Sequence, residues 1–242
     1  GSFTIPSVVK NLIKNNVETL VITLKTDSKQ MSIFSTLVYT GLLKHINILN
    51  NTKDILIPTA SWGTPVIACN SMNYDNVTIV DVQCSVLDKC KQIYNEYVDV
   101  NTLFNKPYSL ETYCIPSERM DTVLDKKYDT VFFCPPYYDL EVYGGSDEQS
   151  TSLYKTYDEW LEGYWKGTVI NCKNVLRDGG IFSFVMGKLI LGKNMSDDMS
   201  KIAKDCGFEL LEEIKIEPID EVRRNKTNDE KYEVCVIMRK NG

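Results

Sequence analysis

The sequence predicts an α/β protein with a mainly parallel sheet of seven strands that ends in an antiparallel hairpin. From residue 54 onward, short apolar runs alternate with amphipathic stretches, as in successive β-α-β units. The last two runs, 208–216 and 232–239, are separated by a charged stretch without helical periodicity, so they suit a hairpin at the sheet edge. The chain has 242 residues and is 43% hydrophobic, which is enough for one domain with a sizeable core.

Residues 1–50 are predicted to form a helical lead-in to a domain over 51–242. Two sets of apolar residues at helical spacing support this prediction: Val8, Val9, Leu12 and Ile13 in the first, and Met31, Phe34, Leu37, Val38 and Leu42 in the second.

Five strands precede the hairpin in this prediction. They cover residues 54–59 (DILIPT), 77–82 (VTIVDV), 112–115, 130–134 (TVFFC) and 181–186. Helices are expected from about residue 65, over 85–97, over 157–176 and over 196–206. The Asp178-Gly179-Gly180 segment is expected to end the third of these helices, because glycine adopts the left-handed conformation that often follows a helix.

Composition narrows the class of protein. The eight cysteines include no CxxC pair and there is only one histidine, so no metal site is expected. Most cysteines are interpreted as small core residues of a protein in a reducing compartment, cytoplasmic or nuclear. No apolar run approaches the roughly 20 residues that span a bilayer, and no targeting signal is visible. The net charge of −6 differs from the basic surface usual for a protein that binds DNA alone.

The strongest chemical signal is FFCPPYYDLEVYGG at residues 132–145. An apolar strand runs directly into two prolines, which remove backbone donors and leave stiff carbonyl acceptors where ligands bind in open α/β sheets. Two acceptors, the side chain of Cys134 and the carbonyl of Pro135, suit the hydrogens of a planar amine, and the ring of Tyr137 suits stacking on the flat group that carries it.

This segment resembles the (Asp/Asn/Ser)-Pro-Pro-(Tyr/Phe/Trp) motif of amino-methyltransferases that use S-adenosylmethionine (SAM). The run from Pro135 to Gly144 is similar to the SPPYYxLxxYG form found in many prokaryotic and phage DNA methylases. The resemblance implies the Rossmann-like class I methyltransferase fold, whose parallel sheet also ends in an antiparallel hairpin, and methylation of adenine N6 or cytosine N4. Cys134 departs from the motif, because a thiol is a weaker acceptor than a carboxylate, amide or hydroxyl.

The cofactor site implied by this resemblance uses the ends of the first three strands. Its predicted residues are Thr59, Ala60, Ser61, Trp62 and Gly63 against the methionine part of SAM, Asp81 for the ribose hydroxyls and Glu118 for the adenine. The turn departs from the family pattern at Ser61, which replaces a glycine, and at Ile57, where an acidic residue is expected.

Substrate contacts are predicted at Tyr137, Tyr138, Asp139 and Tyr143, and residues 143–157 are interpreted as a substrate lid or as an ordinary surface loop. The aromatic residues Trp160, Tyr164 and Trp165 are interpreted mainly as core packing. The basic cluster 223–226 (RRNK) is compatible with phosphate contacts or with a solvated turn.

Four functions follow from these residues. The first is a DNA amino-methyltransferase acting on an exocyclic base amine, with a partner subunit supplying affinity for the nucleic acid or sequence specificity. The alternatives are RNA adenine-N6 methylation, protein glutamine-N5 methylation, and a degenerate methyltransferase fold that serves as a structural or nucleic-acid-binding subunit. Cys134, Ile57 and the acidic composition point to the last of these.

Overall fold

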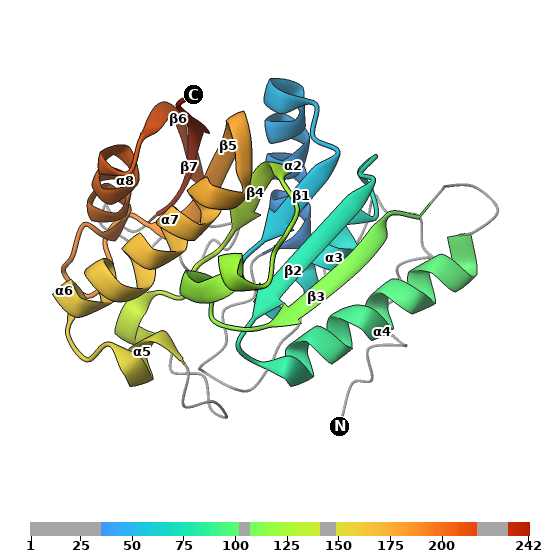
Figure 1. Cartoon of the computed structure of the whole chain (residues 1–242), viewed down its shortest axis with the longest axis horizontal. Helices are drawn as coiled ribbons and strands as arrows, with labels where there is room; N and C mark the ends of the chain where they lie inside the picture. Colours follow the sequence, from blue (N-terminus) through green and yellow to red (C-terminus); the bar gives the residue numbers. More distant parts are fainter. Residues whose placement is uncertain (1–34, 102–106, 141–148, 217–231) are drawn as a thin grey trace.

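The computed structural model describes residues 35–101, 107–140, 149–216 and 232–242. Their centre is a seven-stranded sheet in the order β3-β2-β1-β4-β5-β7-β6. Strands β1 to β5 pair in parallel, whereas β7 pairs antiparallel with both β5 and β6. The predicted fold class, a mainly parallel sheet with a closing antiparallel hairpin, is confirmed (Figure 1).

The strands are β1 (Asp54–Ile57), β2 (Asn76–Asp81), β3 (Ser109–Cys114), β4 (Tyr128–Phe133), β5 (Leu176–Gly187), β6 (Phe208–Ile216) and β7 (Glu233–Lys240). The α-helices are α2 (Thr36–Asn50), α3 (Thr64–Cys69), α4 (Cys84–Asn101), α5 (Ser150–Leu153), α6 (Tyr157–Glu159), α7 (Lys166–Val175) and α8 (Met195–Asp205). Short 3₁₀ segments are η2 (Ser61–Gly63), η3 (Ser117–Thr122) and η4 (Tyr138–Leu140), and η5 (Trp160–Trp165) is a π-helix.

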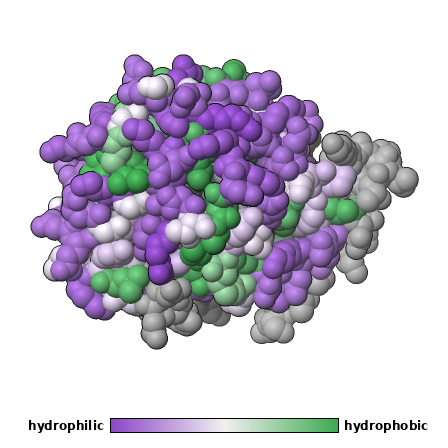
Figure 2. Space-filling model, viewed as in Figure 1, coloured by the Kyte–Doolittle hydropathy of each residue, from purple (hydrophilic) through white to green (hydrophobic). Residues whose placement is uncertain are grey.

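Helices cover both faces of the sheet. Helix α2 packs on α3 and α3 on α4, while η3, α7 and α8 form the other layer (Figure 1). Strands β1, β2 and β4 are apolar along most of their length because side chains on both of their faces are buried between these layers. Figure 2 shows the complementary result, an outer face that is mainly hydrophilic with apolar residues in small groups.

The predicted helical lead-in is described only from residue 35. Helix α2 buries Tyr39, Leu42, Leu43 and Ile46 against the domain. The prediction that Leu37 belongs to the buried face is wrong, since its side chain is 51% exposed. The buried face of α2 is therefore rotated from the predicted one, toward the side on which α3 and the sheet lie. The other predicted apolar face, at residues 8–13, lies outside the described residues.

The predicted turn at 178–180 is instead an irregular stretch within strand β5. Tyr128 pairs with Leu176 and Thr130 with Ile181, so β5 carries extra residues at this point relative to β4. Gly179 has the left-handed φ of 74° that glycine tolerates. The left-handed conformation of a glycine in this segment was predicted correctly. The predicted position of the segment between a helix and a strand was wrong, because β5 already begins at Leu176.

The predicted single helix over 157–176 is interrupted. Its N-terminus has a capping box between Thr156 and Glu159, and a π-helical stretch then separates α6 from α7. Within this stretch a Cβ atom on Gly163 would lie 2.1 Å from Cε1 of Tyr154. The glycine therefore allows the ring of Tyr154 to lie directly against the backbone.

The prediction for the cysteines is partly wrong. Cys69, Cys90, Cys172 and Cys235 are buried core residues, as predicted. Cys84 and Cys114, however, form a disulfide between the start of α4 and the end of β3. The parallel register of β2 and β3 places Asp81 opposite Cys114, which brings the two thiols together although they are far apart in sequence.

Loss of this disulfide is expected to lower the free energy of unfolding by about 3–4 kcal/mol under non-reducing conditions. The two cysteines are 30 residues apart, and closing a loop of that size restricts the unfolded chain by roughly this amount. Chemical denaturation of the Cys114→Ser variant, with and without reductant, measures it. Reductant should destabilise the natural protein and leave the variant unchanged.

Among the described residues, no helix is long and apolar enough to cross a bilayer. The described residues also include no cluster of three or more histidine, cysteine or acidic side chains arranged to hold a metal ion.

Candidate active site

A cavity lies where strands β1, β2 and β4 end. β1 and β4 are neighbours from which the chain continues in opposite directions across the sheet, and such a switch point forms a ligand crevice in open α/β folds. Residues from four chain segments line the cavity: 58, 59, 61 and 62 after β1, 81–83 and 86 at and after the end of β2, 117–118 after β3, and 134–137 after β4. Ser150, Tyr164 and Glu233 complete its wall.

The turn after β1 has an unusual backbone. Ser61, Trp62 and Gly63 have positive φ values of 41°, 57° and 92°. A Cβ on Gly63 would lie 2.7 Å from Cδ1 of Ile93, so close packing on α4 as well as the backbone conformation favours glycine there. The turn exposes part of the Trp62 side chain, which is 39% accessible, at the edge of the cavity.

The carboxylate of Asp81 connects this turn to the end of β2. Its Oδ2 accepts from the amide of Ala60 at 2.9 Å and its Oδ1 accepts from the amide of Gln83 at 2.8 Å. Burial raises the pKa of Asp81 above its ordinary value, and the backbone hydrogen bonds offset only part of that effect. A carboxylate held in this way at the cavity wall retains lone pairs for hydroxyl donors of a ligand.

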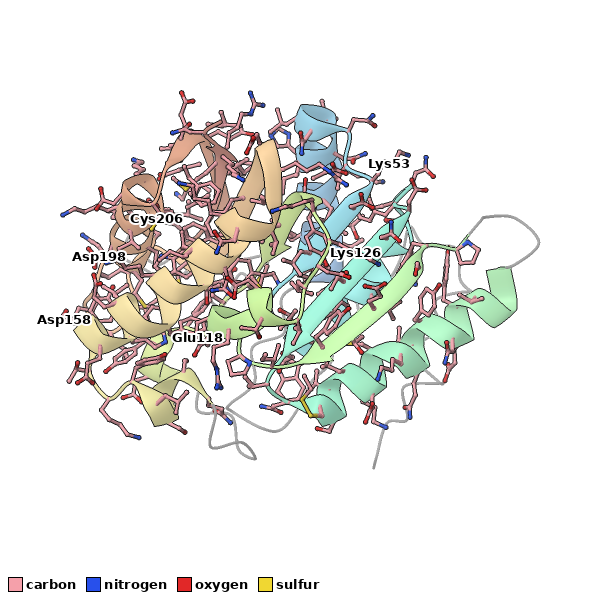
Figure 3. All side chains as sticks on the ribbon, in the orientation of Figure 1. Lys53, Glu118, Lys126, Asp158, Asp198 and Cys206 are labelled. Atoms are coloured by element: carbon pink, nitrogen blue, oxygen red, sulfur yellow. A yellow bond between two sulfur atoms is a disulfide. The ribbon has the colours of Figure 1, made fainter. Side chains whose placement is uncertain are left out.

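Glu118 approaches the cavity from η3. Its side chain lies against α7 (Figure 3). A Cβ on Gly167 of this helix would come within 2.8 Å of the Glu118 Cβ, so the glycine permits the close approach of η3 to α7. Tyr154 donates its hydroxyl to Oε1 of Glu118 at 3.4 Å. The Glu118 side chain is thus bordered by Gly167 of α7 and by Tyr154, which follows α5.

The CPPY segment forms the wall that faces the turn after β1. The hydroxyl of Thr59 donates to the carbonyl of Cys134 at 2.8 Å, which ties the predicted cofactor turn to the predicted catalytic segment. Pro135 is buried, whereas Cys134 and Tyr137 are half-buried, and all three line the cavity. The Tyr137 hydroxyl donates to Oε1 of Glu233 at 2.7 Å.

The structure brings most of the predicted site residues together. Eight of them line this same cavity: Thr59, Ser61, Trp62, Asp81, Glu118, Cys134, Pro135 and Tyr137. Ala60 and Gly63 are buried behind it, where Ala60 supports Asp81 through its amide. These residues shape the wall without lining it.

Two predicted substrate contacts lie elsewhere. Tyr138, with a φ of 47°, packs edge-on against Tyr157 and Trp160 and is not among the residues that line the cavity. Asp139 is exposed and is also absent from the cavity wall. The positive φ at Tyr138 turns the chain immediately after Tyr137. The two consecutive tyrosines therefore point in different directions: Tyr137 lines the cavity, and Tyr138 joins an aromatic cluster with Tyr157 and Trp160.

Other sequence predictions lie partly or wholly outside the described residues. Tyr143 and the first half of the predicted lid belong to 141–148, and the basic cluster belongs to 217–231. The second half of the lid is described and includes α5, from which Ser150 lines the cavity. Trp160 and Trp165 are fully buried, which confirms core packing, while the buried Tyr164 also lines the cavity.

Several lining residues were missed by the sequence analysis, among them Gln83, Ser117, Ser150 and Glu233. Gln83 lies two residues after the end of β2 and Ser117 three residues after the end of β3, so their nearness to strand ends is the sequence signal that indicates them. No sequence pattern indicates Glu233 as a site residue, because it lies at the start of the last strand. It is brought to the cavity by the antiparallel pairing of β7 with β5.

The lining has a pronounced charge character. Asp81, Glu118 and Glu233 contribute three carboxyl groups, and the described lining residues include no lysine or arginine. Such a cavity favours a cationic ligand and disfavours phosphate groups, because the carboxylates lie in a partly desolvated site.

Sequence comparisons yield no matching family model and no matching curated protein. Solved structures do match the fold. The N-methyltransferase NodS from Bradyrhizobium japonicum WM9 in complex with S-adenosyl-L-homocysteine (SAH) has a TM-score of 0.56 at 9% identity, over 85% of this chain and 87% of NodS. A SAM-dependent methyltransferase from Clostridium acetobutylicum ATCC 824 has a TM-score of 0.59 at 12% identity, over 86% of this chain and 93% of that one.

A methyltransferase from Pyrococcus furiosus matches over nearly the full length of both chains. Its TM-score is 0.60 at 13% identity, covering 99% of this chain and 100% of the other. At such low identities the likeness concerns the fold, and it agrees with the strand order and the closing hairpin. The chain has the Rossmann-like fold of SAM-dependent methyltransferases.

Proposed function

We propose that this protein is a SAM-dependent N-methyltransferase that acts on the exocyclic amine of a nucleic-acid base, adenine N6 or cytosine N4 in DNA. One observation carries the proposal. The predicted cofactor residues Thr59, Asp81 and Glu118 and the predicted catalytic segment Cys134–Tyr137 line the same cavity, at the switch point of the sheet.

The charge of the cavity supports SAM as the cofactor. SAM carries a sulfonium and an ammonium cation, one carboxylate and no phosphate, so its net charge is positive. That charge suits three carboxyl groups without lysine or arginine among the described lining residues. Asp81 would accept from the ribose hydroxyls and Glu118 would lie toward the adenine. The turn at 59–63 would hold the methionine part, where the partly exposed indole of Trp62 would favour a cation.

The CPPY segment supports an amine substrate. Bound SAM would supply an electrophilic methyl group. The nitrogen lone pair would form a bond to its carbon, the carbon–sulfur bond would break to release SAH, and the methylated nitrogen would lose one proton to solvent. The protein's own contribution is to orient the amine. The Pro135 carbonyl and the Cys134 thiol would receive its two hydrogens, and Tyr137 would stack on the ring that carries it.

Cys134 provides a test of the amino-methyltransferase subtype. Serine is nearly isosteric with cysteine and is a better hydrogen-bond acceptor. Cys134→Ser should therefore retain or increase methyl transfer, whereas Cys134→Ala should decrease it. A rate unaffected by both substitutions would argue against an amine held at this position.

Nucleic acid as the substrate requires a source of affinity other than overall charge. A net charge of −6 repels a polyanion, so we propose that a partner subunit or a local basic surface holds the nucleic acid. Because the amine of a paired base lies inside the duplex, the target must be single-stranded or flipped out of the helix.

Calorimetry and methyl transfer together test the proposal. SAM and SAH should bind the purified protein, and tritiated methyl groups should pass from SAM to DNA when duplex DNA, single-stranded DNA, RNA and cell protein are compared. Absence of SAM and SAH binding would overturn the cofactor assignment. Binding with transfer only to RNA or to protein glutamine would replace the substrate, and binding without any transfer would favour the degenerate, non-enzymatic reading that Cys134 suggests.

A further inference from the structure

The contact between Tyr137 and Glu233 links two distant parts of the chain within the cavity. The Tyr137 hydroxyl donates to Glu233 Oε1 at 2.7 Å, and both residues line the cavity wall. A hydrogen bond to a carboxylate is stronger than one between neutral groups, so it restrains the far end of the tyrosine side chain.

Glu233 is itself held in place by the sheet. It is the first residue of β7, where it pairs with Gly187 of β5 on one side and Ile216 of β6 on the other. The ladder continues one step beyond this pair, since the amide of Lys188 donates to the carbonyl of Tyr232 at 2.9 Å. A carboxylate on this backbone is a rigid anchor compared with one on a surface loop.

Gly187 lies beside the tyrosine ring at the end of β5. A Cβ at this position would be in ordinary van der Waals contact with Cε2 of Tyr137, at 3.8 Å, whereas it would lie 2.5 Å from Cδ1 of Ile190. The tyrosine side chain therefore passes close to the end of β5 and reaches the carboxylate on the neighbouring strand β7. The ring belongs to the CPPY segment after β4, and the carboxylate that restrains it belongs to β7.

We propose that Glu233 is a positioning residue for methyl transfer, which fixes the ring of Tyr137 at the angle needed to stack on the substrate. This inference rests on the proposed function and extends it to the closing hairpin. Glu233 acts through Tyr137 and not on the reacting atoms. A misplaced stacking ring would let the target amine move relative to the methyl donor, and displacements of about 1 Å cost up to a hundredfold in rate.

Four variants test this role: Glu233→Ala, Glu233→Gln, Tyr137→Phe and the double variant Tyr137→Phe/Glu233→Ala. Glu233→Ala should lower kcat by about tenfold to a hundredfold because it frees the ring. SAH should still bind, since the residues proposed to hold it, Thr59, Asp81 and Glu118, are unchanged. Glu233→Gln retains an oxygen acceptor and should recover most of the rate. Tyr137→Phe should resemble Glu233→Ala, and the double variant should be no slower than the slower single variant.

Glu209→Ala is the matched control, because it removes an exposed carboxylate from the same hairpin, away from the cavity wall. It should change neither kcat nor SAH affinity. Additive losses in the double variant, or full activity in Glu233→Ala, would overturn the proposal.

A crystal structure of Glu233→Ala separates this inference from the proposed function. The ring of Tyr137 should be displaced or adopt several orientations while the strands keep their register. An unmoved ring would overturn the positioning role even if the natural protein methylates DNA. A displaced ring in a protein that transfers no methyl group to any substrate would confirm the restraint on Tyr137, and the proposed function would fail separately.

Discussion

Asp81→Ala is expected to weaken SAM and SAH binding by at least about a hundredfold. The substitution removes the carboxylate proposed to accept from two ribose hydroxyls, and each hydrogen bond to a charged group contributes about 1.5–3 kcal/mol. Calorimetric titration with SAH measures the loss. Affinity equal to that of the natural protein would exclude Asp81 from the cofactor site.

The same substitution also perturbs the fold, and this effect must be measured separately. Asp81 accepts from the amides of Ala60 and Gln83, and an unsatisfied buried amide costs about 1–3 kcal/mol. Thermal unfolding without ligand reports this term. Asp75→Ala, which removes an exposed carboxylate just before the same strand, is the control and should alter neither property.

Asp81 also implies a pH dependence of cofactor affinity. Burial raises its pKa, so the carboxylate gains a proton at a higher pH than an ordinary aspartate does. A protonated Asp81 has lost acceptor capacity, and SAH affinity should therefore fall as the pH is lowered from neutral. Asp81→Asn should lack this part of the dependence, and an identical pH profile in that variant would assign the effect to another group.

Tyr137→Ala is expected to lower the rate of methyl transfer by about tenfold to a hundredfold while SAH still binds. Stacking of a base on an aromatic side chain contributes about 1–3 kcal/mol, and alanine cannot replace it. Steady-state assays with tritiated SAM on the preferred nucleic acid measure the change, and calorimetry shows whether the cofactor site is intact.

Tyr113→Ala is the control for this prediction. Tyr113 is a half-buried tyrosine on the edge strand β3 and does not line the cavity. Its loss should leave the specific activity unchanged. Undiminished transfer in Tyr137→Ala would remove this residue from the proposed substrate site.

Much of the fold followed from local patterns. Apolar runs of strand length alternating with amphipathic stretches predicted the parallel sheet, because strands covered on both faces read as continuous apolar segments. The hairpin was predictable since no helical pattern separates β6 from β7. Asp81 and Cys134–Tyr137 were predicted from sequence because Asp81 ends one apolar strand and Cys134 directly follows another, and ligands bind at strand ends in this class of fold. The structure brings them to one cavity.

Errors arose where a contact depends on residues distant in sequence. Leu37 has the spacing of a core residue but is exposed, whereas its helix presents Tyr39 and Ile46 to the domain together with the predicted Leu42. The π-helical interruption accompanies the close approach of Tyr154 to Gly163, which no periodicity reveals. Tyr138 and Asp139 follow Tyr137 directly, but the positive φ at Tyr138 redirects the chain and neither residue lines the cavity, so their contact with substrate stays a prediction.

The sequence alone determined the fold class and predicted a set of residues that line a common cavity at the strand ends, because both depend on the order and spacing of residues along the chain. Only the tertiary structure decided which distant residues complete that cavity. Glu233 is 96 positions from Tyr137, and the disulfide partners Cys84 and Cys114 are 30 apart. Both pairs meet through strand register, which is set by the packing of the whole sheet and not by any local pattern.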